Sequence, residues 1–158
     1  MTAQATMPSS SSSAASLAIA PITDNDIADV VALWQACGLT RPWNDPAADI
    51  ALARRGPNSA VLVGRDANAI VATAMVGHDG HRGWVYYVAV DPNRQGKGLG
   101  RTIMAAAEDW LRAAGVPKLQ LLVRRENAKA GAFYQSLGYD ESTSVMLAKW
   151  LDGREATP

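Results

Sequence analysis

Runs of apolar, β-branched residues predict strands in the first half of the chain. Two such runs cover residues 59–65 and 69–77, and they are close enough in sequence to form a hairpin. A third strand over 83–90 should pair with the second, because Asp79-Gly80 between them is the strongest type I′ turn signal in the chain. With a short strand over 17–20, these segments predict an antiparallel sheet.

Other segments repeat their apolar positions with the period of a helix. One helix should begin near Thr23 and Asp26, which form a capping pair, and another after Asp45, an N-cap followed by proline. Further helices are expected over 99–114 and after Asn127, where apolar residues again recur every three or four positions.

Two later apolar runs complete the predicted sheet. Residues 119–123 are almost continuously apolar, as expected of a strand covered on both faces, and the helix before them implies parallel pairing with the strand over 83–90. Residues 145–150 should form the last strand. The predicted fold class is α/β, with a mixed, mostly antiparallel sheet split between its fourth and fifth strands and flanked by helices.

Length and composition fit one folded domain. The chain has 158 residues, of which 48% are hydrophobic, which is enough for a real core. Residues 1–16 are rich in Ser and Ala and should form a flexible tail, leaving residues 17–151 as the domain and 152–158 as a short C-terminal tail. Residues 1–16 also lack the basic start and apolar segment of a signal peptide.

Charge and cysteine content narrow the function classes. Fifteen basic and fifteen acidic residues give a net charge of zero, so we expect no nonspecific nucleic-acid binding. No apolar run is long enough to span a bilayer, and we expect no membrane partner. The single cysteine, Cys37, excludes an internal disulfide and a multi-cysteine metal site, and fits a cytoplasmic protein without a metal. No activating base accompanies Cys37, so we interpret it as a packed residue rather than a nucleophile.

A glycine-rich loop follows the strand over 83–90 and opens the next helix. Glycines let a backbone approach a ligand closely, and the first N–H groups of a helix suit a phosphate. The spacing fits neither a P-loop, because Gly98 rather than Ser or Thr follows Lys97, nor the dinucleotide fingerprint. A loop without a ligand is the alternative. The candidate cofactor-binding residues here are Val88, Ala89, Val90, Gln95, Gly96, Lys97, Gly98, Leu99, Gly100 and Arg101.

A second motif runs from Asn127 to Tyr139 and contains Phe133-Tyr134. Together with the pattern Gln95-x-x-Gly98-x-Gly100, it resembles the two signature elements of the GCN5-related N-acetyltransferases (GNAT). The resemblance covers about residues 17–151. The segments 41–45 and 79–83 further resemble the YpeA-type branch of that superfamily.

The resemblance implies a role for each motif. Backbone N–H groups of Gly96–Arg101 would hold the diphosphate of acetyl-CoA, Val88–Val90 would pair with its pantetheine arm, and Asn127 would contact that arm. Tyr134 would be the general acid that protonates the departing thiolate. The alternative for Tyr134 is an aromatic core residue beside Phe133.

The acceptor side is less defined by the sequence. Arg41, Trp43, Asn44 and Tyr86 are candidate substrate-binding residues, because the corresponding loop borders the acceptor pocket in the family. Alternatively, Trp43 caps the core while Arg41 pairs with a carboxylate.

No general base stands out in the sequence. The glutamate that some relatives carry on the fifth strand is replaced by Leu122. The segment 78–81 contains His78, Asp79 and His81, but we interpret it as a solvated turn. Tyr86 or Tyr87 acting through water stays open as a base.

The resemblance therefore implies an N-acetyltransferase that moves an acetyl group from acetyl-CoA to a primary amine, on a small molecule or a peptide, by direct transfer in a ternary complex. A non-catalytic acyl-CoA-binding or regulatory module with the same fold is the alternative. A homodimer is left open.

Overall fold

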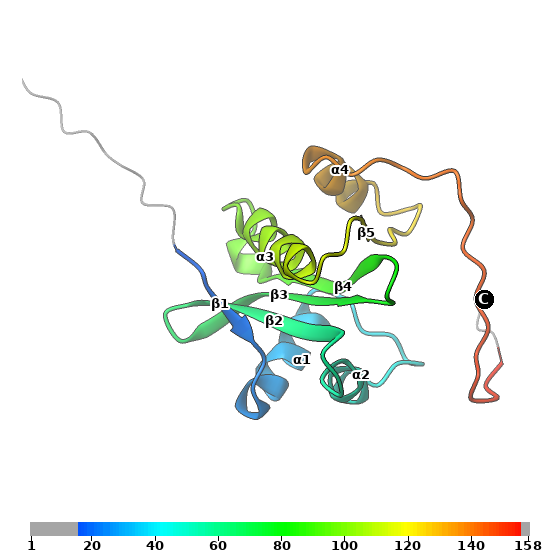
Figure 1. The fold of residues 1–158 in the computed structure, drawn as a ribbon. Coiled ribbons are helices and arrows are strands. Elements are labelled where there is room, and N and C mark those ends of the chain that lie inside the picture. Colours follow the sequence, from blue (N-terminus) through cyan, green and yellow to red (C-terminus); the bar gives the residue numbers. More distant parts are fainter. Residues whose placement is uncertain (1–15, 156–158) are drawn as a thin grey trace, which may run out of the picture. The chain divides into compact units, whose positions relative to one another are not determined.

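The computed structural model describes residues 16–155 and divides into two compact units, one ending at Leu122 and the other beginning at Val123 (Figure 1). The tail predicted for residues 1–16 therefore lies outside the described residues, apart from Ser16. The first unit contains, in order, β1 (Ala18–Pro21), the 3-10 turn η1 (Asp24–Asp26), α1 (Ile27–Ala36), α2 (Pro46–Ala53), β2 (Ser59–Asp66), β3 (Ala69–His78), β4 (Gly83–Val90), the 3-10 turn η2 (Pro92–Arg94), α3 (Leu99–Ala113) and β5 (Leu119–Gln120). The second contains α4 (Ala128–Ser136).

The sheet has the strand order β1-β2-β3-β4-β5. Its first three pairings are antiparallel, and β4 pairs with β5 in parallel. The parallel pairing joins only Gly83 to Leu119 and Trp84 to Gln120, so the two strands separate after their first residues. The predicted mixed sheet, split between its fourth and fifth strands, is confirmed.

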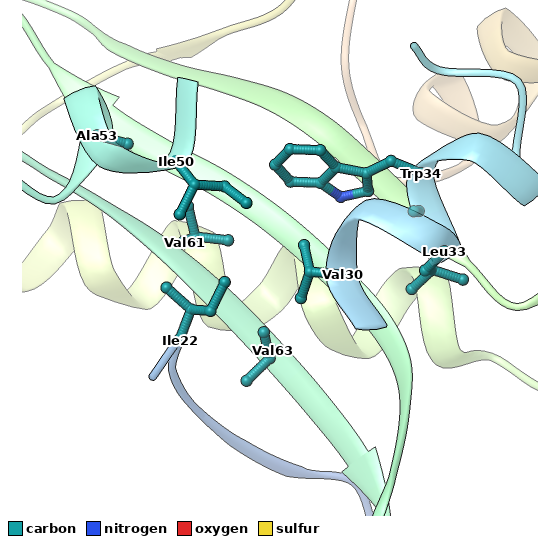
Figure 2. Close-up of a cluster of buried hydrophobic side chains, with 9 residues drawn as sticks. Ile22, Val30, Leu33, Trp34, Ile50, Ala53, Val61 and Val63 are labelled. Atoms are coloured by element: carbon teal, nitrogen blue, oxygen red, sulfur yellow. The ribbon is translucent and has the colours of Figure 1, made fainter. Parts of the chain in front are cut away.

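Helices cover both faces of this sheet. On one face, α1 and α2 enclose a buried cluster with β2 and β4 (Figure 2), whose members are Ile22, Val30, Leu33, Trp34, Ile50, Ala53, Val61, Val63 and Ala89. On the other face, α3 buries Ile103, Met104, Ala107 and Leu111. The packing of α3 is close, because a Cβ at Gly83 would lie 2.5 Å from Cδ1 of Leu111. A larger residue at this end of β4 would force the Leu111 side chain to shift.

The predicted helix starts are confirmed at the level of individual hydrogen bonds. The backbone N–H and the hydroxyl of Thr23 each donate to Oδ2 of Asp26 at 2.7 Å, which closes the capping pair before α1. The carboxylate of Asp45 accepts from the N–H groups of Ala47 and Ala48 at 3.0 and 3.1 Å, ahead of α2.

The hairpin between β3 and β4 forms as predicted, but its turn is of another kind. His78 pairs with Gly83, so the connection contains four residues rather than two. Gly80 has a φ of 85°, whereas Asp79 does not adopt the positive φ that a type I′ turn needs. The cause is the Asp79 side chain, which accepts from the N–H groups of His81 and Arg82 at 2.9 and 2.7 Å and closes a different loop.

The strands predicted late in the chain are shorter or absent. The run 119–123 forms a strand only over Leu119–Gln120, and residues 145–150 form none. The second unit contains α4 but no strand among its described residues, so the run 145–150 has no ladder to join within that unit. Its apolar side chains are exposed instead, at 84% for Val145 and 91% for Leu147. The prediction of a closing strand is wrong for this structure.

Candidate active site

The glycine-rich loop joins β4 to the N-terminus of α3. Gly96 and Gly98 adopt φ values of 78° and 79°, a left-handed conformation that few other residues tolerate. Gly98 is the N-cap of α3, and its carbonyl accepts from the N–H of Thr102 at 3.1 Å. The N–H groups of the first helical turn precede that bond and have no partner within the helix. The positive end of the dipole of this 15-residue helix therefore lies at the glycine-rich loop.

The side-chain charges near this loop are not all available to a ligand. Arg94 forms an ion pair with Asp66 at the end of β2, so it neutralises a carboxylate of its own chain. Gln95 and Arg101 also interact with other groups of the protein. Lys97 is exposed at the tip of the loop. A bound anion would therefore rely first on backbone N–H groups and then on Lys97.

The edge of β4 that faces away from β3 is open along most of its length. Within residues 16–155, β5 is the strand on that side, and it pairs with β4 no further than Trp84. Val88, Ala89 and Val90, predicted to bind the cofactor arm, lie beyond this point. Unpaired strand edges bind extended ligands through backbone hydrogen bonds. This stretch of β4 fits such a ligand.

Cys37 packs beneath the end of β4. Its Sγ donates to the carbonyl of Val90 at 3.3 Å, and burial raises the pKa of the thiol. A raised pKa leaves little thiolate near neutral pH, which makes this cysteine a poor nucleophile. The geometry agrees with the interpretation of Cys37 as a packed residue.

A β-bulge interrupts β4 just before Val88. Thr73 of β3 pairs with Ala89 and Met75 pairs with Tyr86, so the single residue between them on β3 faces both Tyr87 and Val88. Tyr87 takes a φ of 50°, which is unusual for a residue with a large side chain. The bulge directs Tyr87 to the α1 side of the sheet, where strict alternation would have placed it with Val85 on the α3 side.

Three contacts hold Tyr87 in this conformation. Its ring stacks on Trp34 of α1, with centroids 3.8 Å apart and planes 9° from parallel. Its carbonyl accepts from the hydroxyl of Thr73 at 3.0 Å, and Nε1 of Trp34 donates to the same hydroxyl oxygen at 2.9 Å. Its own hydroxyl donates to Oδ2 of Asp49 on α2 at 2.6 Å. The bulge is thus fixed by α1, α2 and β3 together.

Asp49 and Asn44 surround the Tyr87 hydroxyl. Burial, followed by the hydrogen bond to Asp49, raises the pKa of Tyr87, while the neighbouring Asn44 side chain acts to lower it. The phenol is therefore un-ionised near neutral pH, which argues against Tyr87 as a base. Sequence reasoning missed Asp49. The available signal was the pair of adjacent tyrosines, Tyr86-Tyr87, in an otherwise apolar strand.

The other predicted acceptor residues have mixed surroundings. Tyr86 is 48% exposed and lies opposite Met75, which packs against the α1–α2 cluster. Trp43 is half-buried. Nη1 of Arg41 donates to the carbonyls of Gly38 and Thr40 at 2.7 and 2.9 Å. Arg41 thus braces its own loop and forms no ion pair with a carboxylate among the described residues, contrary to one of the two alternatives.

The segment 78–81 is a turn held by its own hydrogen bonds. Asp79 accepts from two backbone N–H groups and from Nε1 of Trp84, and these bonds lower the pKa of its carboxyl to about 2. His81 is exposed. The prediction of a solvated turn is confirmed.

The second unit carries the remaining predicted residues. Asn127 is the N-cap of α4, and its side-chain oxygen accepts from the N–H of Ala130 at 3.1 Å, which leaves its amide N–H₂ for other contacts. Tyr134 lies between Phe133 and Tyr139, with ring centroids at 5.0 and 5.9 Å. Burial raises the pKa of Tyr134, so its phenol keeps its proton near neutral pH.

Residues 16–155 contain no helix with the length and apolar character that crossing a membrane requires. The same part of the chain contains no group of three or more His, Cys, Asp or Glu side chains placed to hold a metal ion.

Comparison with known sequences gives one consistent family. Residues 27–139 match the model of the Acetyltransferase (GNAT) family. A protein from Yersinia enterocolitica named acetyltransferase is 39% identical over 127 residues, which are 80% of this chain and 90% of that relative. One from Sodalis glossinidius, named in the same way, is 38% identical over 123 residues, or 78% of this chain and 87% of the relative.

Solved structures agree with this family. The ribosomal-protein-S18-alanine N-acetyltransferase from Escherichia coli superimposes with a TM-score of 0.69 and 26% identity, covering 81% of this chain and 80% of that one. AAC(6')-Iy in complex with the bisubstrate analog CoA-S-monomethyl-acetylneamine gives a TM-score of 0.73 at 16% identity, covering 85% and 98%. The second likeness is one of fold.

Proposed function

Because this chain belongs to the Acetyltransferase (GNAT) family and its relatives are named acetyltransferases, we propose that it transfers an acetyl group from acetyl-CoA to a primary amine. The observation that carries the proposal is the left-handed pair Gly96 and Gly98, which opens α3 directly after the unpaired part of β4. The bound analog in AAC(6')-Iy contains CoA, which supports the same donor for this fold.

Each part of the loop region has a role in holding acetyl-CoA. The N–H groups from Gly96 to Arg101 bind the diphosphate, with Lys97 adding charge. Backbone groups of Val88, Ala89 and Val90 pair with the pantetheine arm, as an added strand would. Asn127 contacts the arm through the amide N–H₂ that its capping bond leaves over. Acetyl-CoA supplies the acyl group as a thioester, whose leaving group is a thiolate.

Tyr134 is the proposed general acid. A thiol comparable to cysteine has a pKa of about 8.5 and an unperturbed phenol one of about 10, so the proton moves to the thiolate at a modest cost. Burial raises the pKa of Tyr134, which increases this cost and also guarantees that the phenol is protonated when needed.

The acceptor attacks acetyl-CoA directly in a ternary complex. A covalent route would need an activated nucleophile, and the thiol of Cys37 has a raised pKa and donates to the Val90 carbonyl. The acceptor amine approaches along the α1–α2 face of β4, where Trp43, Asn44 and Tyr86 contact it. Arg41 supports them by fixing the loop before α2.

A second candidate function follows from the residue at position 122. Leu122 stands where some relatives carry a glutamate base, which favours a module that binds acyl-CoA without turnover.

The deciding experiment combines calorimetry with thiol release. We expect acetyl-CoA to bind, and free thiol to accumulate only when an amine or peptide from a broad panel is added. One equivalent of protein thiol from Cys37 must be subtracted, and a Cys37→Ala variant removes that background. Binding without acceptor-dependent thiol release would favour the module, and absence of acetyl-CoA binding would exclude both functions.

A further inference from the structure

Asp49 forms no ion pair with a basic side chain of the described residues. It is half-buried on α2, and its Oδ2 accepts from the Tyr87 hydroxyl at 2.6 Å. Four other aspartates of the first unit are each paired with an arginine, namely Asp24, Asp26, Asp66 and Asp109. Asp49 has no such partner among residues 16–155. A partly buried negative charge is screened less by salt than an exposed one, so it attracts a cation more strongly.

The position of this carboxylate is fixed from several sides. Its partner Tyr87 is stacked on Trp34 and held at the β4 bulge by Thr73, so the hydroxyl that donates to Oδ2 has a fixed position. Asn44 lies beside the same hydroxyl. The N-cap of α2 at Asp45 sets the start of the helix that carries Asp49. One oxygen of Asp49 is therefore occupied by a rigid donor, and the other accepts no hydrogen bond from the residues that the structure describes.

The surroundings of Asp49 belong to the acceptor side of the proposed reaction. Tyr86, Tyr87 and the loop with Asn44 share the α1–α2 side of β4, immediately before the Val88–Val90 stretch that the proposal assigns to acetyl-CoA. Strained backbone, such as the positive φ of Tyr87, concentrates at sites where a protein must hold a group in place. Here the group held is Asp49.

We propose that Asp49 binds a second, non-reacting cationic group of the acceptor, so that the substrate is an amine with another positive charge a few bonds away, such as an aliphatic diamine. This inference rests on the proposed transfer to a primary amine and specifies the chemical class of that amine. The cation bound by Asp49 is an ammonium or guanidinium group. Tyr87 positions the carboxylate through its hydroxyl and does not contact the reacting atoms.

The assignment to a non-reacting group follows from proton chemistry. A carboxylate beside an ammonium favours its charged form, whereas the attacking nitrogen must lose its proton first. A carboxylate would therefore hinder the reacting amine and help a second one. Asp49 also lies at the hydroxyl end of the Tyr87 side chain, away from the β4 backbone that would hold the thioester.

The test compares two amines that differ in one charge. Cadaverine carries two ammonium groups and pentylamine one, on the same five-carbon chain. Calorimetric titration of each into the protein, with and without CoA, measures binding without any turnover. We expect cadaverine to bind wild-type protein at least about 10-fold more tightly than pentylamine, a typical effect of one desolvated charge pair.

Two variants locate the effect. Asp49→Asn removes the charge but keeps an oxygen that accepts from Tyr87, and should abolish the preference for cadaverine over pentylamine. Asp29→Asn removes an equal charge from the exposed face of α1 and should keep the preference. If Asp49→Asn proves unfolded by its melting curve, Asp49→Ala, which favours the helix, takes its place.

The outcomes separate this inference from the proposed transfer. An unchanged cadaverine preference in the folded Asp49 variant, or no preference in wild-type protein, overturns the inference. Cadaverine binding that depends on Asp49, in a protein that releases no thiol from acetyl-CoA, supports the inference and excludes the transfer. Loss of both preference and binding in the Asp29 variant as well would show a general charge effect and would also overturn it.

Discussion

The hydroxyl of Tyr134 can be removed by substitution while the ring is kept, so its proposed role as a general acid can be tested at one oxygen atom. Tyr134→Phe keeps the edge contacts with Phe133 and Tyr139 and removes only the hydroxyl group, whose proton would pass to the thiolate. We expect acetyl-CoA affinity to stay within a few fold and kcat to fall by roughly 10²–10⁴, the usual contribution of a positioned acid. Steady-state kinetics and calorimetry on one preparation measure both.

A structural role for the same hydroxyl would give the opposite pattern. Loss of one hydrogen bond costs about 1 kcal/mol of unfolding free energy and leaves kcat nearly intact. A melting curve on the same sample distinguishes the two, and wild-type turnover in the phenylalanine variant would remove Tyr134 from the mechanism.

Gly98 allows charge and backbone strain to be examined separately. Its φ of 79° penalises most side chains, but Asn and Asp both tolerate this conformation and have the same size. A Cβ at Gly98 meets no atom within 4 Å beyond its two chain neighbours, so the cost of either residue is the strain of the positive φ, which the two variants share. Gly98→Asn should therefore weaken acetyl-CoA binding modestly, whereas Gly98→Asp adds a negative charge at the diphosphate and should weaken it at least about 10-fold more.

Calorimetry on both Gly98 variants, with melting temperatures as a check on folding, provides the comparison. Equal affinities of the Asn and Asp variants would show that no anion lies at this loop.

At the scale of elements, one buried hydroxyl takes part in two of the hydrogen bonds around the β4 bulge. Thr73 is fully buried, and its hydroxyl both accepts from Trp34 and donates to the Tyr87 carbonyl. Thr73→Val keeps the shape and removes the partner of the buried Nε1 of Trp34 and of the partly buried Tyr87 carbonyl. We expect unfolding free energy to fall by about 2–3 kcal/mol in urea denaturation, since each unsatisfied group costs about 1–3 kcal/mol.

Thr73→Ser is the matched control for this change. It keeps the hydroxyl and loses one methyl group, so it should cost only about 1 kcal/mol, mostly through lost burial. A valine variant as stable as the serine variant would mean that the bulge does not need these hydrogen bonds. It would then be held by the Trp34 stack and the Asp49 bond.

The whole molecule shows which features were encoded locally. The starts of α1 and α2 were predictable because Thr23, Asp26 and Asp45 make their bonds within three residues along the chain. The hairpins and the glycine-rich loop were predictable for the same reason, because turn residues and strand patterns are local features of the sequence. The family resemblance of the two motifs was likewise carried by short segments.

The remaining features depend on contacts between distant residues. The bulge at Tyr87 requires Trp34 and Thr73, which are 39 residues apart, and the Asp49–Tyr87 bond joins residues 38 apart. Apart from the adjacent tyrosines, Tyr86-Tyr87, the sequence of this strand gives no sign that Tyr87 turns to the other face. The prediction of a strand over residues 145–150 was wrong for a related reason. The apolar residues suggested a buried strand, but the sequence did not show whether a neighbouring strand would lie beside it. The pairing of Arg94 with Asp66 could not be read from either segment alone.

Acid stability of the whole fold should depend on the ion pair between Asp26 and Arg65. Oδ1 of Asp26 lies 2.6 Å from Nη2 of Arg65, with the carboxylate side chain 12% exposed, and the pair links the start of α1 to β2. This contact, together with bonds from Thr23, lowers the pKa of Asp26 from 3.8 to about 2. A lowered pKa stabilises the folded state above pH 4, and this contribution is lost as pH falls from about 4 to 2.

Asp26→Asn should therefore reduce unfolding free energy at neutral pH by up to about 2 kcal/mol, because a shift of one pKa unit corresponds to 1.36 kcal/mol. Below pH 2 the variant and the wild-type protein should converge, since both then lack the charge. Asp24→Asn is the control, because the Asp24 carboxylate is 84% exposed in its pair with Arg54 and such pairs contribute little. Urea denaturation at a series of pH values measures all three proteins. Curves for wild type and Asp26→Asn that stay parallel from pH 7 to pH 2 would show that other carboxylates control the acid transition.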